Sequence, residues 1–368
     1  MLDPFGWYID PSSYRWFLTL LVQILFAASL LLLLVMILFK IIVERKEARL
    51  ALLRQRFAEE MEEFLAGGGA IPVPTGIEEV SACADIAADI LKRCSHKDAL
   101  RLQDALGETG IPRRLAEEVT GRRSWTRRYQ ALERLGFLKI PSLRPLYRRM
   151  AGDADLRIAA KAIWALSLVA EPDDLPFILG TVARIETLSS KFTEYLCANA
   201  VTAIATSRGD GAVMETVREI MEGDLPILIQ RDLMESFGRI GFTPAVPVLL
   251  EAWRRSDDAS EIRVTVIRAL GTMGSPAIGE LLPNALADHD WRVRVVASNF
   301  AHLAAERTLP LLEKLLTDRS YHVRLNAAAT LARLGAAGRE ALHRALAGND
   351  QYARDVARYH LTRWGFAP

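Results

Sequence analysis

Cysteine and aromatic residues are scarce in this sequence of 368 residues. Aromatic residues make up 8% of it, and the three cysteines are Cys83, Cys94 and Cys197. No two of them form a Cys-x-x-Cys pair, and the spacing of Cys83, Cys94 and His96 is not a zinc pattern. The sequence therefore excludes a disulfide framework and favours buried thiols in a reducing compartment.

Catalytic and metal-binding motifs are also missing. The sequence contains no HExxH, GxSxG, GxGxxG or phosphate-loop motif. None of the six histidines has a second histidine or a carboxylate in an arrangement typical of a metal site: His96, His289, His302, His322, His343 and His360. We predict no catalytic residue, no metal and no cofactor, and we expect a protein that binds rather than an enzyme.

The chain has no strong net charge of either sign, since its formal charge is +1. The charges are unevenly distributed, however. Residues 121–149 hold nine basic side chains and one acidic side chain. Residues 150–290 carry an excess of nine acidic side chains, and residues 291–368 an excess of six basic ones. This alternation favours the docking of proteins over the binding of a uniform polyanion, so nucleic acid is not an expected partner.

One long hydrophobic run lies near the start of the chain. Residues 16–39, from Trp16 to Phe39, contain no charged side chain. At about 1.5 Å per residue this run is about 36 Å long as a helix, which is enough to cross a bilayer. It is too long for the core of a signal peptide, and no small-residue cleavage site follows it. We predict a transmembrane helix at 16–39 and a short extracytoplasmic segment at 1–15.

The charges that flank this run predict its orientation. Its N-terminal side has one basic residue, Arg15, whereas its C-terminal side has six: Lys40, Arg45, Lys46, Arg49, Arg54 and Arg56. By the positive-inside rule, the large C-terminal part lies in the cytoplasm and the N-terminus lies outside. We therefore predict a single-pass protein of a bacterial inner membrane.

A helical stalk is predicted to continue the membrane helix. Residues 40–65 contain strong helix formers and neither glycine nor proline. Apolar residues recur every seven positions along this segment: Val43, Leu50, Phe57 and Phe64. Such a seam is typical either of self-association through a short coiled coil or of a face packed on the rest of the protein. Glycines and prolines in residues 66–76 predict a linker after the stalk.

The rest of the sequence, residues 77–368, repeats itself with a period of about 30 residues. In four segments that align without gaps, an arginine recurs with spacings of 31, 30 and 30 residues: Arg263, Arg294, Arg324 and Arg354. Arg127 and Arg157 are assigned to the same position in two earlier segments. Each unit is predicted to contain two helices, of which the first ends at a glycine, such as Gly136 or Gly274, and the second begins near a proline. We count about eight such helical hairpins, regular from residue 121.

At this spacing the units share the pattern D…VR..AA..L..LG. It resembles the short HEAT-like repeats of bacteria, the type also found in phycobilisome lyases, and the resemblance covers about residues 98–368. The resemblance implies an all-α, armadillo-type superhelix, an α-solenoid, with a concave surface that binds partners. Residues 187–224 depart from the pattern, which indicates a local irregularity or a widened groove.

The row of repeat arginines has two interpretations. It forms either a cationic track for phosphate or acidic peptide, or a set of clamps in which each arginine pairs with an aspartate or a helix end of an adjacent unit. Aspartates recur in phase with the row, for example Asp288 and Asp318. This recurrence favours the clamps.

A separate basic cluster lies in the first regular unit, with aromatic side chains among its members. The candidates for binding a partner are Arg122, Arg123, Arg127, Arg128, Arg144, Arg148 and Arg149. Such a cluster is typical of a surface for an anionic partner, either an acidic protein face or anionic lipid headgroups. A solvated face without a partner is the alternative.

Together these features predict a membrane-anchored scaffold that binds and positions protein partners, as part of a polysaccharide-synthesis, secretion or signalling complex. The alternative is a HEAT-like enzyme, either a chromophore lyase or a DNA-modifying protein. The lyase needs an enclosed apolar pocket, and the DNA-modifying protein needs a basic concave face near a catalytic carboxylate. The anchor and the acidic middle of the chain disfavour the DNA-modifying protein.

Overall fold

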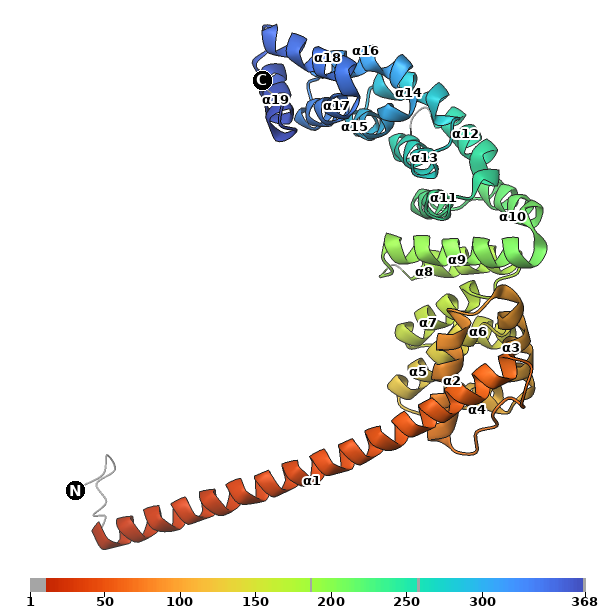
Figure 1. Ribbon diagram of the computed structural model, residues 1–368, viewed down its shortest axis with the longest axis vertical. Helices are drawn as coiled ribbons and strands as arrows, with labels where there is room; N and C mark the ends of the chain where they lie inside the picture. Colours follow the sequence, from red (N-terminus) through yellow and green to blue (C-terminus); the bar gives the residue numbers. More distant parts are fainter. Residues whose placement is uncertain (1–10, 186, 257–258, 367–368) are drawn as a thin grey trace. The chain divides into compact units, whose positions relative to one another are not determined.

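The computed structural model describes residues 11–185, 187–256 and 259–366. Within these ranges the regular secondary structure is helical, and no strand is found (Figure 1). The chain divides into two compact units, residues 1–117 and residues 118–368, which are described separately.

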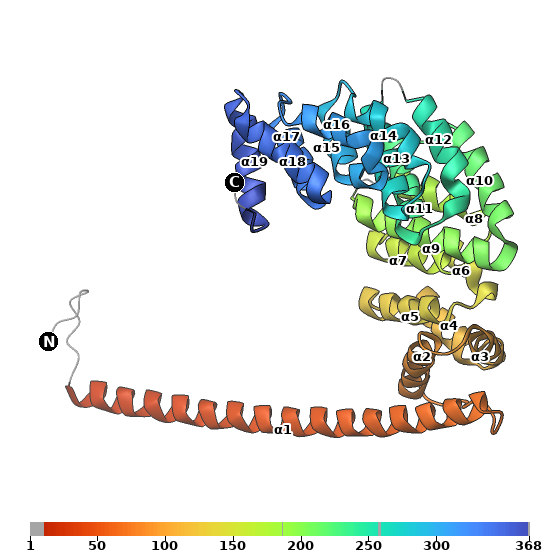
Figure 2. The same cartoon turned by 45° about the horizontal axis from the view of Figure 1, so that its top comes forward.

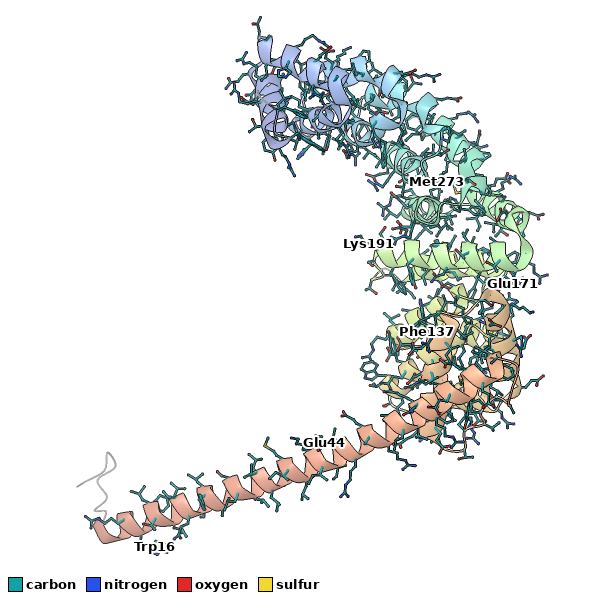
Figure 3. The ribbon with its side chains drawn as sticks, in the orientation of Figure 1. Trp16, Glu44, Phe137, Glu171, Lys191 and Met273 are labelled. Atoms are coloured by element: carbon teal, nitrogen blue, oxygen red, sulfur yellow. The ribbon has the colours of Figure 1, made fainter. Side chains whose placement is uncertain are left out.

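The first unit begins with one long helix, α1 (Pro11–Leu65), of 55 residues. It runs without a break through the predicted membrane span and the predicted stalk (Figure 2). Between Trp16 and Phe39 its large apolar side chains are exposed on all sides (Figure 3). Among the described residues, α1 is the one helix long and apolar enough to cross a membrane, with a mean hydropathy of 2.9 over its best window. Of the predicted outer segment 1–15, residues 1–10 lie outside the described residues.

The C-terminal part of α1 packs against two shorter helices, α2 (Ile77–Leu91) and α3 (His96–Glu108). Phe57 and Met61, on one face of α1, are 2% and 0% exposed. Of the two interpretations of the heptad seam, a face packed on the rest of the protein therefore holds for this part of the stalk. Arg101 of α3 donates to two carbonyl oxygens at the end of α1, at 3.4 Å, which satisfies acceptors that a helix end leaves open.

The boundary between the two units lies inside the next helix, α4 (Ile111–Thr120). The sequence pattern places the start of the repeat array earlier, at residue 77. The structure instead groups residues 77–117 with the stalk, because α2 and α3 cover the apolar face of α1. In the predicted linker 66–76, Gly67 and Gly69 take positive φ angles of 94° and 66° as the chain turns away from α1.

The second unit consists, within its described residues, of seven pairs of helices followed by a single helix. The first helices of the pairs are α5 (Trp125–Leu138), α7 (Leu156–Ser167), α9 (Ser190–Arg208), α11 (Ile227–Ile240), α13 (Ser260–Met273), α15 (Trp291–Phe300) and α17 (Tyr321–Arg333). The second helices are α6 (Arg144–Met150), α8 (Asp174–Arg184), α10 (Asp210–Glu222), α12 (Val246–Arg254), α14 (Ile278–Leu286), α16 (Ala305–Leu315) and α18 (Gly335–Ala347). Short 3-10 turns precede three of them: η1 (Pro141–Leu143), η2 (Thr243–Ala245) and η3 (Ala301–Ala304). The single helix is α19 (Gln351–Arg363).

Successive first helices pack against one another, and so do the second helices from α14 onward. Figure 1 shows this unit as an arc in which α10, α12, α14 and α16 follow the outer side. Small and branched apolar side chains fill the space between the two rows, for example Ala327, Ala328 and Leu331 of α17. Each pair buries its apolar faces only against its neighbours, as expected of a repeat array. The all-α solenoid predicted from the sequence is confirmed.

Glycines end several first helices, although not all of them at the predicted position. Gly241 and Gly274 take left-handed φ angles of 66° and 65° at the ends of α11 and α13. Gly136 instead lies within α5, and Lys139 takes the left-handed conformation with a φ of 50°. A Cβ atom on Gly136 would lie 2.5 Å from the ring of Trp164. This glycine is therefore needed for the close approach of α5 and α7 rather than for ending a helix.

Buried ion pairs connect one unit of the array to the next. Arg263 of α13 pairs with Asp288 at 2.8 Å, and Arg294 of α15 pairs with Asp318 at 2.7 Å. The four side chains are at most 11% exposed. Each aspartate lies in the turn before the next first helix, where its carboxylate also accepts a backbone N–H at 2.8 Å. These arginines therefore act as clamps between units, and we call the series of equivalent arginines the arginine ladder.

The other ladder arginines share part of this arrangement. In α5 the ladder member is Arg128, which pairs with Asp153 in the turn before α7. The sequence alignment assigned this position to Arg127, one residue too early. Arg324 and Arg354 each donate to a carbonyl oxygen in the turn before their own helix, at 2.6 and 2.8 Å, as Arg294 also does. Neither Arg324 nor Arg354 forms an ion pair with any described residue. The ladder therefore has aspartates along part of its length and lacks them in its last two members.

Arg157 does not belong to the ladder, although the sequence alignment places it there. It pairs with Asp155, the capping residue of its own helix α7, at 2.7 Å, and its side chain is 54% exposed. Arg292 has the same relation to Asp290 in α15. The ladder position in α7 is two residues further on, at Ala159, and two residues rotate a helical side chain by more than half a turn. The sequence alignment is therefore shifted by two residues in this unit.

Removing a ladder arginine should destabilise the array more than removing Arg157. In Arg263→Ala the carboxylate of Asp288 stays buried without its partner, and losing one member of a buried pair costs about 3–5 kcal/mol. Arg157→Ala breaks an exposed pair and should cost far less. Chemical denaturation of the full chain in detergent at neutral pH, followed by circular dichroism, measures both. Equal losses in the two variants would contradict the ladder.

Candidate functional site

Part of the predicted basic cluster has structural partners. Arg144 donates to the carboxylates of Asp173 and Asp174 at 2.9 and 2.6 Å, and Arg148 does the same at 2.6 and 2.5 Å. Asp174 is completely buried. The two arginines of α6 therefore hold the start of α8 and are not available as a free cationic surface.

The remaining members of the cluster are more accessible. Arg128 is half-buried against Asp153, whereas four arginines are exposed and form no ion pair with a described residue: Arg122, Arg123, Arg127 and Arg149. Beside them, the Trp125 ring is 45% exposed and lies 3.8 Å from the guanidinium carbon of Arg157. The predicted cluster thus divides into a structural set and an exposed set, and the exposed set is the candidate for binding a partner.

A second candidate surface is a groove of about 740 Å³ that crosses α9, α11 and α13. Figure 3 places Lys191, at its rim, on the inner side of the arc. Its charged lining comes from three consecutive units and includes Glu194, Arg231, Asp232, Glu235, Arg239 and Arg268. Stacking of the first helices brings these side chains together. We call this surface the inner groove.

Ion pairs between neighbouring helices organise the inner groove. Glu235 and Arg239 are four residues apart and so share one face of α11. Arg239 reaches back to Glu194 of α9 at 2.7 Å, and Arg268 of α13 reaches back to Glu235. The arginines are 46% exposed, whereas the two glutamates are 18% and 15% exposed. The groove therefore has an acidic floor and a basic rim.

Asp232 is the most buried charged group of this floor, at 3% exposed. It accepts hydrogen bonds from the Ser190 hydroxyl and from Arg231. Burial nevertheless raises the pKa of Asp232 above its ordinary value, and burial likewise raises the pKa of Glu235 in spite of Arg268. A raised carboxyl pKa means that the negative charge is incompletely compensated. A cationic side chain brought in by a partner would therefore be stabilised here.

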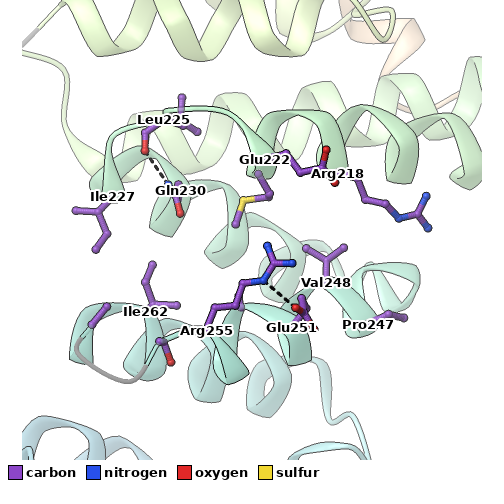
Figure 4. A pocket seen from close by; sticks show the side chains of 14 residues that line it. Arg218, Glu222, Leu225, Ile227, Gln230, Pro247, Val248, Glu251, Arg255 and Ile262 are labelled. Atoms are coloured by element: carbon purple, nitrogen blue, oxygen red, sulfur yellow. Dashed lines mark hydrogen bonds and ion pairs between the residues drawn. The ribbon is translucent and has the colours of Figure 1, made fainter.

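A further cavity of about 500 Å³ lies between α10 and α12, close to the segment that departs from the repeat pattern (Figure 4). Ile227, Val248 and Ile262 supply much of its apolar lining. At its edges Gln230 donates to the carbonyl oxygen of Leu225 at 2.7 Å. Glu251 of α12 pairs there with Arg255, the residue that follows the helix, at 2.8 Å. These polar groups thus have partners within the chain. For Arg218 and Glu222 of the same lining, no hydrogen bond or ion pair to a described residue is found.

No cluster of three histidine, cysteine or carboxylate side chains that would hold a metal is found in the residues that the structure describes. Burial raises the pKa of the Cys83 thiol to about 12, and it raises the pKa of Cys197 as well. Both thiols are therefore protonated at neutral pH and unreactive as nucleophiles.

The sequence predicted a local irregularity or a widened groove at residues 187–224, but it did not predict which side chains line the inner groove. The repeat pattern fails between residues 187 and 224, and the groove begins at Ser190. The sequence does show that Glu235 and Arg239 are four residues apart and so share one face of a helix. It does not show which neighbouring helices complete the groove. That information comes from the stacking of α9 and α13 on α11.

Comparison with known proteins agrees with this architecture. The HEAT-repeat family patterns match residues 214–301 and residues 308–337. No curated protein sequence shows a significant match. Residues 214–301 and 308–337 thus consist of HEAT repeats, within a unit that is an α-solenoid. Solenoids of HEAT repeats generally bind other proteins.

Several solved structures align with this chain. A structure of Kap95p with RanGDP aligns with 11% identity over 86% of this chain and 53% of its own, with a TM-score of 0.43. The CpcE–CpcF complex of phycocyanin lyase from Nostoc sp. PCC7120 aligns with 15% identity over 76% and 94%, with a TM-score of 0.25. Kap121p aligns with 14% identity over 78% and 41%, with a TM-score of 0.35. The chain spans about half the length of the Kap95p chain.

The pH dependence of stability should reveal the uncompensated charge of Asp232. Its folded-state pKa is raised, so the wild type should lose stability relative to Asp232→Asn as pH rises from about 4 through the folded-state pKa. Asp318 is the matched control of opposite sign. Burial alone would raise its pKa, but Arg294 and a backbone N–H outweigh burial and lower it. The advantage of the wild type over Asp318→Asn should therefore shrink as pH falls below about 4. Denaturation at several pH values measures both, and parallel trends would contradict the assignment.

Charge reversal should separate the two sets of the basic cluster. Replacing Arg122, Arg123, Arg127 and Arg149 together by Glu should leave the helical content and the unfolding midpoint close to wild type, because exposed substitutions cost little. Arg148→Glu alone should lower the midpoint clearly, since it places a third carboxylate beside Asp173 and Asp174. Thermal unfolding followed by circular dichroism measures both variants. A stable Arg148→Glu protein would contradict the structural role.

Proposed function

We propose that this chain is a membrane-anchored scaffold that holds a protein partner in the inner groove on the cytoplasmic side of a bacterial inner membrane. The observation that carries the anchor is the exposure of α1: between Trp16 and Phe39 every large apolar side chain faces outward. Such a side chain gains about 1.5–3 kcal/mol on leaving water. A bilayer supplies an apolar surrounding of the required thickness for the whole segment.

The orientation of the anchor follows from the basic residues after the apolar segment. Four basic residues follow the apolar segment on the same helix, within about ten residues of Phe39: Lys40, Arg45, Lys46 and Arg49. Basic residues at this place favour the cytoplasmic side, so the chain from Lys40 onward is assigned to the cytoplasm. The same bias leaves the residues before Trp16 outside.

The inner groove supports the binding part of the proposal. Its floor carries Asp232 and Glu235, whose charges burial leaves incompletely compensated. Its rim carries Arg239 and Arg268, which are half-exposed and so can exchange their partners for those of an incoming segment. A protein segment with both basic and acidic side chains is the occupant that fits this distribution. Host complexes for polysaccharide synthesis, secretion or signalling are all compatible with such a scaffold.

Anchor and orientation can be tested together. We expect the chain to sediment with the inner membrane and to be released by detergent but not by high salt, because the association is apolar. A reporter fused at the C-terminus should be active if it requires the cytoplasm and inactive if it requires the periplasm. A periplasmic C-terminus would reverse the orientation, and release by salt alone would refute the membrane span.

The groove is tested by site-specific crosslinking in intact cells. A photocrosslinking residue in place of Lys191, at the rim, should give a discrete adduct with a partner. The same residue in place of Arg254, on α12, is the matched control and should not give it. Glu235→Gln keeps the shape of the floor but removes a charge, and it should reduce the Lys191 adduct. Equal adduct yields from both positions would contradict binding in the groove. So would a yield at Lys191 that Glu235→Gln leaves unchanged.

A further inference from the structure

The complete members of the arginine ladder grip an aspartate with one edge of the guanidinium group. Arg294 donates from Nε and Nη2 to the two carboxylate oxygens of Asp318, at 2.7 and 2.8 Å. Arg263 uses the same two atoms on Asp288, at 2.8 and 3.3 Å. This edge of each ladder arginine is therefore the edge that receives a carboxylate.

Arg324 presents the same edge without a carboxylate. Asp318 follows Arg294 by 24 residues, and the residue at the same distance after Arg324 is Gly348. The Arg324 side chain is 9% exposed, and its buried Nε has no hydrogen-bond partner in the described part of the chain. Its Nη1 still donates to the carbonyl oxygen of Asp318 at 2.6 Å, so the group keeps the ladder position. A buried donor without an acceptor is costly, which makes this position unusual.

Aromatic side chains surround this position and remain accessible. The rings of Tyr352 and Tyr321 lie 4.9 and 5.9 Å from the guanidinium carbon of Arg324, and they are 64% and 55% exposed. Trp291 continues the row at the start of α15 and stacks on His322 at 5.5 Å. Exposed aromatic rings beside an arginine are a composition enriched in protein interfaces.

We propose that this edge of the array, at the starts of α15, α17 and α19, binds an acidic segment of a partner protein, and that a carboxylate of the segment takes the ladder position on Arg324. Charge complementarity supports this occupant, because residues 291–368 hold twelve basic and six acidic side chains. Of the aspartates at this edge, Asp290 and Asp318 are already paired with Arg292 and Arg294. Asp350 caps α19 by accepting the backbone N–H of Ala353 at 2.8 Å. The surface is separate from the inner groove and does not depend on what the groove binds.

A carboxylate reaches Arg324 when the Tyr352 ring moves aside. This ring is the more exposed of the two tyrosines, so its displacement breaks few contacts. Two parallel N–H donors then meet two carboxylate oxygens, the geometry that Arg294 and Asp318 already show. The neighbouring aromatic rings would cover the backbone of the segment on either side.

Restoring the missing aspartate within the chain is the direct test. Gly348→Asp should supply the carboxylate to Arg324 and so exclude an external one. Gly348 has a φ of −77°, which any residue adopts, and its Cβ would lie 3.3 Å from the carbonyl oxygen of Ala345. Gly348→Ala therefore controls for the added Cβ. The probe is a fluorescent Asp-rich decapeptide, titrated by anisotropy with the full chain in detergent at low salt. We expect similar binding to the wild type and Gly348→Ala, and binding about tenfold or more weaker to Gly348→Asp.

A second variant keeps the test decisive if Gly348→Asp does not fold. Arg324→Gln keeps a hydrogen-bonding side chain but removes the charge. It should weaken binding of the decapeptide by a similar factor. The Asn-rich counterpart of the decapeptide should not bind the wild type. Equal affinity of Gly348→Ala and Gly348→Asp, or of the wild type and Arg324→Gln, would overturn the proposal. So would attachment to phosphatidylglycerol vesicles that depends on Arg324 without any binding of the decapeptide.

Discussion

The buried pair between an arginine of one unit and an aspartate of the next is the interaction on which the regular part of the array depends. Apolar stacking alone leaves the register of neighbouring helices poorly defined, because alanine and leucine surfaces pack in several ways. Arg263 and Arg294 remove this freedom, since each finds its carboxylate at one relative position of the two units. A shifted register would leave two buried charges uncompensated. The pairs therefore contribute specificity of stacking, whatever their net contribution to stability.

The same reasoning explains how the charges of the chain are distributed. Much of the conspicuous arginine content holds the fold together: Arg128, Arg144 and Arg148 each engage an aspartate of the following unit. Charges free to meet a partner are therefore fewer than the composition suggests, and they lie where the pairing is incomplete. The inner groove contains carboxyls that burial leaves poorly compensated, and the edge near Arg324 contains a guanidinium without its carboxylate.

The regular repeats could be predicted from the sequence because each unit carries its own signals. Arginine, helix-ending glycine and apolar spacing recur locally, so the solenoid and the ladder members Arg263 and Arg294 follow from alignment. In the weaker units the alignment gave wrong assignments. The ladder position lies two residues after Arg157, and Gly136 allows the close approach of α5 and α7 instead of ending a helix. The grouping of residues 77–117 with α1 could not be predicted, because it depends on which apolar faces meet in space. The lining of the inner groove could not be predicted for the same reason, since three units supply it.

The groove and the α10–α12 cavity both lie where the ladder is interrupted. In α7 the ladder position is occupied by Ala159. In α11, comparison of the helix boundaries with those of α13 gives Gln230 as the equivalent residue. Gln230 keeps the bond to a carbonyl oxygen of the preceding turn, at 2.7 Å, but offers no charge to the next unit. Without a buried ion pair to preserve, the spacing of α9, α10 and α11 is free to depart from the regular stack. Cavities are therefore tolerated at this point at lower cost than beside Arg294, where opening the stack would expose or separate a charged pair. In a repeat array the constraint acts between nearest neighbours, so one relaxed interval can acquire a binding surface while the units on either side keep their register.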